Sequence, residues 1–599
     1  MNEDSAIPTP STSSGPAPPL LSLTGREWVF REVDNREVQV FSQKHDIPDM
    51  LAQILVARGV RLEEVEQFLN PSLKVSIPDP SHFLDMDIAA TRVATAVTAG
   101  ERIALFGDYD VDGATSSALL VRYLRALGAE PFMYIPDRMK EGYGPNTEAL
   151  LGLQKRGVRL VITVDCGTMA FEPLEAAHNA GLEVIVIDHH IGEARRPKAC
   201  AIVNPNRLDE TSPHRQLAAV GVAFLLMVAV NRRLRETGFF AGKTEPDLRQ
   251  WLDIVALGTV CDVVPLTGVN RAFVAQGLKV MAARGNLGLR TILDMAAVSE
   301  IPSVYTCGFV IGPRINAGGR VGKSDLGVRL LTTEDPAEAM VLAKELELHN
   351  AERKAIEAFV LEEAQAQAEA ADPSTSVLIV VGRGWHAGVI GIVAGRLKER
   401  FHKPVAVIAL NDGIGKASAR SVSGIDFGAA VIAAHEAGLL MAGGGHAMAA
   451  GFTVEEEKIP ALAEFLEARM RSLPGQSGSA RRLSLDGMIS IGGATAELIA
   501  NLDRMGPFGQ GNPQIRLAVQ GVINLKPEIV GEHHVKTLFI DPLTNVRLSA
   551  IAFRVVGTKL GDALLATRGK KLDVAGQLRL QEWNGRQSVS LMIDDVMMG

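Results

Sequence analysis

Short apolar runs rich in β-branched residues alternate with helical segments between residues 76 and 333. Such alternation is typical of a parallel sheet whose strands are joined by helices. Four runs are interpreted as buried strands that lead into acidic or histidine side chains. Because ligands of an open parallel sheet lie outside the carboxyl ends of its strands, we expect these side chains to gather at one edge. The runs are 103–105, followed by Asp108, Asp110 and Asp112; 160–164, followed by Asp165; 184–187, followed by Asp188, His189 and His190; and 254–258, followed by Asp262.

The same pattern divides the rest of the chain. A long stretch rich in Ala, Glu, Leu and Lys, without glycine, predicts one exposed helix that connects two domains. Near the carboxyl end, short alternating runs between turn residues, interrupted by one helix near 494–502, predict a small β-barrel. The predicted segments are a disordered tail at 1–20, a helical segment at 21–75, a parallel α/β domain at 76–333, the connector helix at 334–371, a second α/β domain at 372–472, a linker at 473–480 and the barrel at 481–599.

The composition is that of a multidomain globular protein. The chain has 599 residues, 47% of them hydrophobic and 22% charged, and this length predicts about two to four domains. The net charge of −8 is weak evidence against a polyanionic substrate, because a basic groove can be local. The longest apolar run, 217–230, is too short to span a bilayer and predicts a buried helix, and the amino terminus does not resemble a signal peptide, so no membrane association is expected. Four cysteines without a CxxC pair predict a reduced, cytoplasmic setting and no structural zinc site.

Three carboxylates crowd the end of the first run, Asp108, Asp110 and Asp112. Like charges this close repel strongly unless a cation lies between them, and a bound divalent metal is the simplest such cation. A calcium loop of the EF-hand type would need Glu at its twelfth position, which here is Leu119, and its flanks would be helical. A solvated acidic turn is the remaining alternative, and the recurrence of the same chemistry at the other strand ends argues against it.

The adjacent histidines narrow the choice of metal. His189 and His190 follow a predicted buried strand, which does not suit a surface tract. Neutral imidazole is a good ligand for transition metals, so the mixed set favours Mn²⁺ over Ca²⁺, with Mg²⁺ as the other candidate. Taken alone, Asp165 and Asp262 could equally cap helices. The cysteine beside each is interpreted as a small buried packing residue.

Further motifs follow one another in order along the chain. Those of the first α/β domain are Asp-Tyr-Asp-Val-Asp-Gly at 108–113, Glu-Gly-Tyr-Gly-Pro-Asn at 141–146, Asp-Cys-Gly at 165–167, Asp-His-His at 188–190, Cys-Asp-Val-Val-Pro at 261–265 and Gly-Pro-Arg-Ile-Asn-Ala-Gly-Gly-Arg at 312–320. This series resembles the DHH phosphoesterase superfamily and, within it, the RecJ family of single-strand-specific exonucleases. Residues 385–394 and 443–451 are similar to the companion DHHA1 domain. Gly318, where a second alanine is expected, is a minor departure.

The resemblance implies a fold and a metal site. The fold is α/β: a DHH parallel-sheet domain is joined by a long connector helix to a second α/β domain, DHHA1, which is followed by a carboxyl-terminal OB-fold β-barrel. Two Mn²⁺ or Mg²⁺ ions per active site would share Asp165 as a bridging ligand, while Asp188 would orient the histidines. By this similarity, Asp108 and Asp110 complete one metal site, Asp112, His189 and Asp262 complete the other, and the catalytic residues are Asp110, Asp112, Asp165, His189, His190 and Asp262.

The resemblance also implies contacts to DNA, for which arginine is suited because it binds phosphate bidentately. Ser418 and Arg420, helped by Arg138, would hold the 5′ end. OB-folds hold single strands by stacking and a basic face. The implied substrate residues are Arg138, Arg314, Asn316, Arg320, Ser418, Arg420 and His446; the barrel candidates are Phe508, Phe553 and Trp583 for stacking and Lys536, Arg554 and Arg579 for the backbone.

The implied activity is 5′→3′ hydrolysis of single-stranded DNA to 5′-mononucleotides by two metal ions, in recombination and repair. A single-strand-binding protein and a RecQ-type helicase are implied partners, and the chain is expected to be a monomer. One alternative is a DHH phosphodiesterase for very short oligonucleotides or cyclic dinucleotides, against which the barrel at 481–599 argues. Another is a binding module that has lost its metals, against which the complete ligand set argues.

Overall fold

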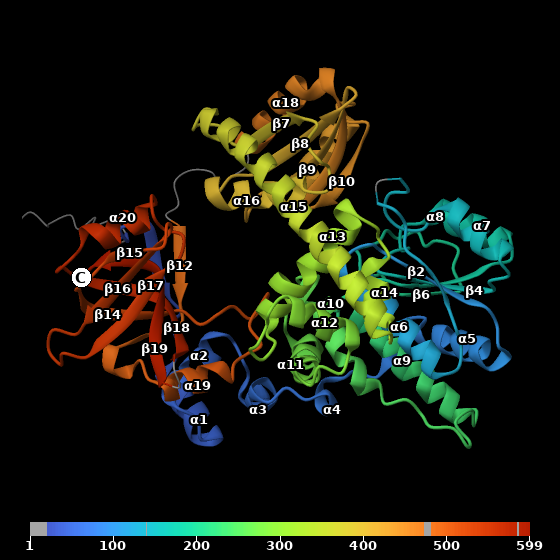
Figure 1. Cartoon of the computed structure of the whole chain (residues 1–599), viewed down its shortest axis with the longest axis horizontal. Helices are drawn as coiled ribbons and strands as arrows, with labels where there is room; N and C mark the ends of the chain where they lie inside the picture. Colours follow the sequence, from blue (N-terminus) through green and yellow to red (C-terminus); the bar gives the residue numbers. More distant parts are fainter. Residues whose placement is uncertain (1–20, 139, 473–480, 584–585) are drawn as a thin grey trace, which may run out of the picture. The chain divides into compact units, whose positions relative to one another are not determined.

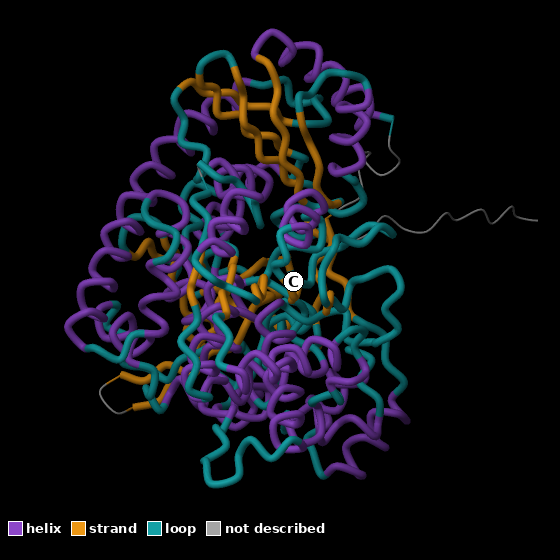
Figure 2. Tube along the Cα trace, turned by 90° about the vertical axis from the view of Figure 1, so that its right-hand side faces the viewer, coloured by secondary structure: helices purple, strands orange, loops and turns teal. Residues whose placement is uncertain are grey.

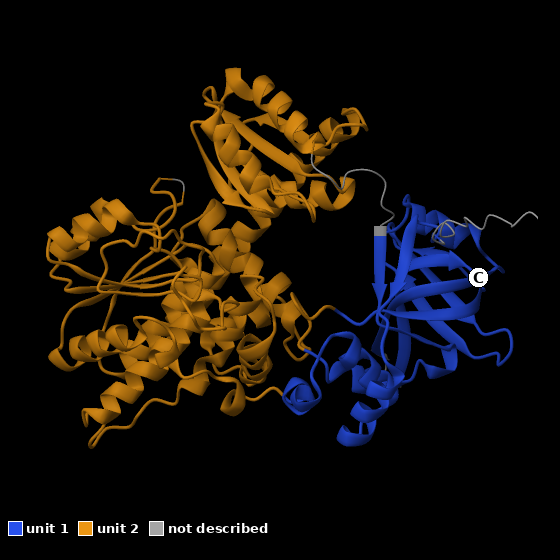
Figure 3. Cartoon of the chain, turned by 180° about the vertical axis from the view of Figure 1, so that it is seen from behind, with its two compact units in different colours: residues 1–70, 478–506, 514–599 blue, residues 71–477, 507–513 orange. Residues whose placement is uncertain are grey.

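The computed structural model describes residues 21–138, 140–472, 481–583 and 586–599 (Figure 1). The predicted tail and the predicted linker at 473–480 lie outside the described residues. The chain divides into two compact units, one of which holds residues 71–477 together with 507–513, and the other the remainder (Figure 3). In the described part of the chain, no helix has both the length and the apolar composition that crossing a membrane requires.

The first α/β domain contains a sheet of five parallel strands. They are β2 (Ile103–Gly107), β3 (Phe132–Tyr134), β4 (Leu160–Val164), β5 (Glu183–Ile187) and β6 (Ala201–Val203), with helices α5 (Met86–Ala99), α6 (Val111–Ala126), α7 (Thr147–Lys155) and α8 (Phe171–Asn179). The strand order is β3-β2-β4-β5-β6. β2 and β4 are buried along their whole length, as expected of central parallel strands covered on both faces. The order reverses between β2 and β4, which is where α/β sheets bind ligands.

One predicted strand is wrong. The run 254–258 lies in helix α10 (Leu252–Cys261), whose residues 252–259 are all buried. A short helix buried on every side has no polar stripe, so periodicity cannot distinguish it from a buried strand. The helix predicted at 217–230 is confirmed as α9 (Ala219–Glu236). The other helices of this region are η3 (Leu248–Trp251), α11 (Gly268–Ala282), α12 (Leu287–Met295), the π-helix η4 (Thr306–Ile311), α13 (Gly312–Val321) and α14 (Leu326–Thr332).

The predicted connector is a single helix, α15 (Pro336–Ala370). Its start is fixed by Asp335, whose side chain accepts a hydrogen bond from the backbone N–H of Ala337, and by proline at the first position. The helix is not exposed on all sides, since it packs against α12, α13 and α14 along its first half and against the second α/β domain along its last.

The second α/β domain has a mixed sheet in the order β10-β11-β9-β8-β7. Only β7 and β8 are parallel. Figure 2 shows helices on both faces of this sheet; α15 and α16 cover one face, and α17 and α18 the other. The elements are β7 (Leu378–Arg383), α16 (Ile390–Phe401), β8 (Val405–Asn411), β9 (Ile414–Arg420), α17 (Phe427–Glu436), β10 (Ala442–His446), β11 (Ala449–Glu455), η5 (Glu456–Lys458) and α18 (Ile459–Arg471).

The other unit contains a closed barrel. Its strands pair in the order β14-β18-β19-β17-β16, and β16 pairs back to β14. This order, with β17 and β19 parallel and helix α20 between β17 and β18, is that of an OB-fold. The hydrophobic pattern did not predict α20. The elements are β13 (Gly487–Ile489), η6 (Ile491–Gly493), α19 (Ala496–Asp503), β14 (Leu517–Asn524), β15 (Glu528–Val530), β16 (His534–Ile540), β17 (Arg547–Ala552), α20 (Lys559–Ala566), β18 (Lys571–Trp583) and β19 (Arg586–Met598).

The amino-terminal segment belongs to the barrel's unit. Strand β1 (Arg26–Phe30), which the sequence did not predict, pairs in parallel with β12 (Arg481–Leu485). The indole Nε1 of Trp28 donates a hydrogen bond of 2.9 Å to Asp595 Oδ2. An ion pair of 3.2 Å joins Arg58 to Asp486. The helices are α1 (Asn35–His45), α2 (Asp49–Ala57), η1 (Leu62–Glu64) and α3 (Val65–Leu69), while α4 (Leu73–Ser76) and η2 (Pro80–His82) belong to the larger unit.

Candidate metal centre

The ends of β2, β4, β5 and α10 bring together every side chain predicted to bind metal. Three groups each place one oxygen or nitrogen atom per residue within 4.8 Å of the others. Asp165 is common to two of the groups, and His189 to two. The groups are Asp108, Asp110 and Asp165; Asp112, His189 and Asp262; and Asp165, His189 and His190.

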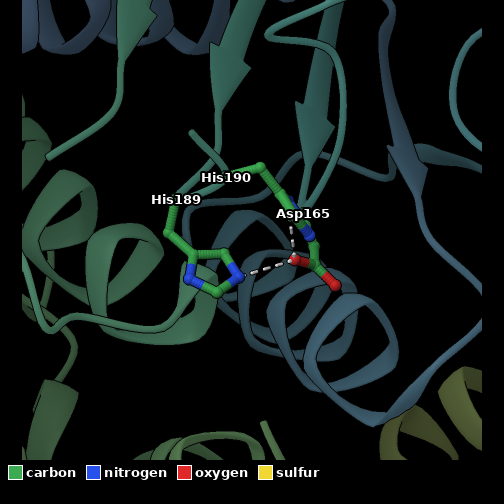
Figure 4. A group of neighbouring side chains, drawn as sticks. All are labelled: Asp165, His189 and His190. Carbon is green, nitrogen blue, oxygen red and sulfur yellow. Dashed lines mark ion pairs between the residues drawn. The ribbon is translucent and has the colours of Figure 1, made fainter. Parts of the chain in front are cut away.

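His189 lies at the centre of this cluster. Its Nε2 is 3.3 Å from Asp165 Oδ1, 3.5 Å from Asp262 Oδ2 and 3.8 Å from Asp112 Oδ2. Figure 4 shows that the same carboxylate oxygen of Asp165, Oδ1, approaches both histidines, at 3.3 Å from His189 Nε2 and 3.8 Å from His190 Nδ1. One imidazole nitrogen therefore faces three carboxylates from three different elements, an arrangement that a shared cation would stabilise.

Local backbone geometry aims the acidic side chains. Asp110 caps α6, since its Oδ1 accepts hydrogen bonds from the N–H groups of Asp112 and Gly113 at 2.8 and 3.1 Å. A Cβ at Gly113 would lie 2.4 Å from the carbonyl oxygen of Asp108, so only glycine allows the helix to start this close to the loop. Asp165 has a φ of 59°, in the left-handed region that few non-glycine residues adopt, and such strain is often found at functional sites.

Asp112 is held by the start of helix α9. Its Oδ2 accepts a hydrogen bond of 2.7 Å from the N–H of Ala219, and its Oδ1 one of 3.0 Å from Val220. A helix amino terminus favours a negative charge. Burial and the charge of Asp110 nevertheless raise the pKa of Asp112 to about 7.

Several atoms of the cluster are buried and have no hydrogen-bond partner among the described residues: Asp108 Oδ1, Asp165 Oδ1, Asp262 Oδ2 and His189 Nε2. Burial, reinforced by neighbouring carboxylates, raises the pKa of Asp262 to about 9 and holds the pKa values of Asp108 and Asp165 far above the ordinary value. Burial and the charge of His190 lower the pKa of His189 to about 4, so its imidazole is neutral, as a metal ligand must be. Unpartnered buried polar atoms cost free energy, and a divalent cation would supply their missing partner.

Asp188 holds the histidines from behind the cluster. Its Oδ1 accepts hydrogen bonds from the N–H groups of His189 and His190 at 2.8 and 3.2 Å and lies 2.8 Å from His190 Nδ1, and its Oδ2 accepts one from Thr168 N at 3.0 Å. Burial acts to raise the pKa of Asp188, but the bond to His190 and these other donors outweigh it and lower the pKa below its usual value. Burial acts to lower the pKa of His190, but the hydrogen bond to Asp188 and the nearby carboxylate charges outweigh it and raise this pKa.

Cationic side chains line a cavity of about 490 Å³ beside α16. The Nη1 of Arg420 donates to Ser418 Oγ at 3.1 Å. A Cβ at Gly391 would lie 3.1 Å from that oxygen, so glycine lets the start of α16 approach it. Burial lowers the pKa of Arg420, and within the described part of the chain no carboxylate forms an ion pair with it. The predicted residues that line this cavity are Arg138, Arg320, Ser418 and Arg420.

A neighbouring cavity of about 550 Å³ is lined by one further predicted substrate residue, Asn316, and again by Arg320. Arg320 therefore lines both cavities. Two of the predicted substrate residues, Arg314 and His446, do not line either cavity. Arg314 pairs with Glu347 at 2.5 Å, and His446 lies exposed at the end of β10. Neither is among the described residues that line these two cavities.

Comparison with known proteins agrees with this arrangement. The models of the DHH family N-terminal domain, the DHHA1 domain and the RecJ OB domain match residues 102–259, 374–472 and 485–595. The single-stranded-DNA-specific exonuclease RecJ of Dickeya dadantii is 36% identical over 566 residues, 92% of this chain and 96% of the relative. The chain belongs to the RecJ family. The RecJ of Escherichia coli is 35% identical over 565 residues, with the same two coverages.

A solved RecJ structure supports the fold. The crystal structure of RecJ from Thermus thermophilus in complex with Mn²⁺ is similar with a TM-score of 0.80 and 31% sequence identity, over 95% of this chain and 79% of that chain. The predicted fold class of the RecJ-family chain, with DHH, DHHA1 and OB domains, is thereby confirmed.

Some residues that support the metal centre were not predicted. Asn204 Nδ2 donates to the carbonyl oxygen of His190 at 2.8 Å, and Asn206 Nδ2 to that of His189 at 2.6 Å. The hydroxyl of Tyr143 donates to the carbonyl oxygen of Asp165 at 2.9 Å. Both asparagines follow β6, another apolar run that ends in polar residues, so the rule that located the aspartates could have located them.

The residues predicted to contact DNA from the barrel have three different outcomes. Phe553 is exposed, with its ring centre 5.2 Å from that of His534, and Lys536, Arg554 and Arg579 are exposed as well. Phe508 was assigned to the wrong part of the RecJ chain, because residues 507–513 belong to the unit of the metal centre. The side chain of Trp583 lies outside those described.

Mn²⁺ affinity of this RecJ-family protein is expected to rise with pH, because the metal needs deprotonated carboxylates. The pKa values raised by burial, about 7 for Asp112 and about 9 for Asp262, mean that protons compete with metal below those values. Without metal, these carboxyls lower the free energy of unfolding as pH rises from their unfolded values, near 4, toward the folded ones. Calorimetry in buffers of different ionisation enthalpy checks this through proton release. An Mn²⁺ affinity that does not change with pH would contradict it.

Proposed function

We propose that this chain is a metal-dependent exonuclease that degrades single-stranded DNA from the 5′ end to 5′-mononucleotides in recombination and repair. The observation that carries the proposal is the convergence of buried, unpartnered carboxylate and imidazole atoms at one sheet edge. The curated relatives bear the name single-stranded-DNA-specific exonuclease, and the T. thermophilus RecJ structures are complexes with Mn²⁺ and with Mg²⁺. The convergence also disfavours a binding module that has lost its metals.

The proposed ligands follow the groups seen in the structure. Two ions, Mn²⁺ or Mg²⁺, would be held by the six predicted side chains, with Asp165 as the residue that both groups approach. When bound, such a pair of cations polarises a phosphodiester and lowers the pKa of water toward about 7, so no separate strong base is needed. The proposed ligands are Asp108, Asp110, Asp112, Asp165, His189 and Asp262.

Asp188 positions the histidine side chains at the proposed metal site. Asp188 fixes the ring of His190 through Nδ1 at 2.8 Å, which leaves Nε2 free to contact a phosphate. The raised pKa of His190 favours its protonated form, which suits an anionic substrate. Asp188 thus acts through the histidines, and the side chain of His190 is 40% exposed.

The polarity of digestion is proposed to come from the cavity beside α16. Ser418, Arg420 and Arg138 line it and would hold a terminal 5′-phosphate. Arg320 also lines the neighbouring cavity, which reaches Cys261 and Val263 on either side of Asp262. A strand bound by its 5′ end would therefore pass the metal centre and continue along the second cavity, and the barrel favours polymeric strands over dinucleotides.

End-labelled DNA tests the proposal. Purified protein with Mn²⁺ is expected to release a labelled mononucleotide at the earliest times from 5′-labelled single strands and from 5′ tails. Blunt duplexes should stay intact, and chelation should stop the reaction. An intact 5′ tail, or first release of a 3′ label, would overturn the proposed activity or its direction.

The proposal also covers the oligomeric state, the cellular setting, the partners and the domain boundaries. We propose a monomer, because all the proposed ligands come from one chain, and a cytoplasmic setting, because the four cysteines are free. Cooperation with a helicase and a single-strand-binding protein is proposed because a duplex must be opened to give the substrate. The proposed domains are those predicted from the sequence, at 76–333, 372–472 and 481–599 with the connector at 334–371; the family models match within them.

A further inference from the structure

A short segment from the carboxyl-terminal third of the chain packs beside the metal centre. Residues 507–513, Pro-Phe-Gly-Gln-Gly-Asn-Pro, belong to the unit that contains the metal centre, whereas 478–506 and 514–599 belong to the other unit. We call this segment the 507–513 loop. Its partner is the segment that follows Asp262.

The loop is tied to that segment through its backbone. The N–H of Leu266 donates a hydrogen bond of 2.7 Å to the carbonyl oxygen of Gln510. The loop also closes on itself, because Asn512 Nδ2 donates to the carbonyl oxygen of Pro507 at 2.9 Å and the N–H of Gly509 donates to the carbonyl oxygen of Asn512 at 2.8 Å. It is therefore an ordered support for the segment it contacts.

Two glycines make the contact possible. A Cβ at Gly509 would lie 2.7 Å from Leu266 Cδ1. Gly511 has a φ of +73°, and a Cβ there would lie 3.1 Å from Pro265 Cβ. Any side chain at Gly511 would thus meet both backbone strain and a close neighbour.

The segment after Asp262 needs such a support. Asp262 ends α10, and the next residue, Val263, has a φ of 61°. This left-handed conformation is a marked outlier for a β-branched residue and persists only where the surroundings fix it. Val263 cannot be fixed by its own side chain, which is 66% exposed. On its amino-terminal side, the N–H of Val263 donates a hydrogen bond of 3.2 Å to the carbonyl oxygen of Val260. On its carboxyl-terminal side, residues 265–267 are held by the loop and by Asn270, whose Nδ2 donates to Pro265 O at 3.0 Å.

We propose that the 507–513 loop is a positioning element for Asp262. By holding residues 265–267, it keeps Val263 in its left-handed conformation and so directs the Asp262 carboxylate toward His189, 3.5 Å away. The inference rests on the proposed function in that Asp262 holds a metal. Gly509 and Gln510 line the cavity that contains Val263 and Arg320, and neither Gly511 nor Asn512 is among its lining residues.

Gly511→Ala tests the inference, with Gly531→Ala as the matched control. Gly531 also has a positive φ, +62°, but a Cβ there would meet nothing within 4 Å, and it lies in the barrel's unit. The expected result is an Mn²⁺ dissociation constant about ten-fold higher for Gly511→Ala by calorimetry, with a similar rise in the Mn²⁺ concentration for half-maximal cleavage. Single-strand affinity measured without metal should not change. The control should match the wild type in all three measurements.

An unchanged Mn²⁺ dissociation constant in folded Gly511→Ala protein would overturn the inference. Where that variant does not fold, Asn512→Ala takes its place: it removes the side-chain hydrogen bond to Pro507, one of those that close the loop, and an unchanged Mn²⁺ dissociation constant in folded Asn512→Ala protein would likewise overturn the inference. Calorimetry separates the two proposals, because wild-type protein that binds Mn²⁺ but leaves DNA intact refutes the nuclease and not the loop's role.

Discussion

Replacement of Asp165 by alanine is expected to lower the rate of DNA cleavage by at least about a thousand-fold. Its carboxylate is the one that approaches both metal groups and lies 3.3 Å from His189, so its loss removes a ligand that the two proposed ions share. A thousand-fold corresponds to about 4 kcal/mol of transition-state stabilisation, within what Lewis-acid chemistry supplies. Single-turnover cleavage of 5′-labelled DNA measures the effect.

Asp165→Asn is the better matched variant. Asparagine tolerates the left-handed backbone that Asp165 adopts, whereas alanine adds strain there, so the amide isolates the loss of charge. Both variants should still bind single-stranded DNA without metal, because the phosphate contacts lie elsewhere. Full activity in either variant would show that Asp165 is not the shared ligand.

Arg420→Ala is expected to reduce kcat/KM on 5′-phosphorylated strands by about 10- to 100-fold. Hydrogen bonds to charged groups contribute about 1.5–3 kcal/mol, and the uncompensated guanidinium of Arg420 lies beside Ser418 in the cavity assigned to the terminal phosphate. Strands with a 5′-hydroxyl should lose much less. Competition between the two kinds of end in one reaction gives the ratio directly.

The control for this variant is Arg400→Ala. Arg400 is an exposed arginine of the same domain, paired with Glu369 at 2.6 Å and remote from the lining of the cavity. It should leave the preference for 5′-phosphate intact. If Arg420→Ala reduced kcat/KM equally on 5′-phosphorylated and 5′-hydroxyl strands, Arg420 would contact the strand but would not recognise the terminal phosphate.

The metal centre was predictable from sequence because it obeys a rule of topology. Asp108, Asp165 and His189 follow apolar strands of one parallel sheet, and the carboxyl ends of such strands share an edge. Asp262 lies in the cluster as predicted, but it follows a helix and not the predicted strand. The two were confused because a buried helix and a buried strand have the same apolar signature. For Asp262, the sequence therefore predicted the neighbouring side chains correctly and the secondary structure wrongly.

Contacts between segments far apart in the sequence were not predictable. The pairing of Leu266 with Gln510 is made by backbone atoms, which leave no pattern of side chains. Arg314 was grouped with the substrate residues by its motif, but Glu347 on α15 pairs with it. Local patterns predict which residues end a strand, and tertiary packing decides which of them face a cavity.

The parallel pairing of β1 with β12 has a consequence for biosynthesis. β1 and its Trp28, which bonds to Asp595, leave the ribosome before most of the chain has been made, including both partners. The nascent amino-terminal segment must therefore remain unpaired, with its apolar side chains open to chaperones, until translation is nearly complete. A premature stop codon near the end of the message would deprive the earliest residues of their packing while leaving the sheets of both α/β domains fully encoded.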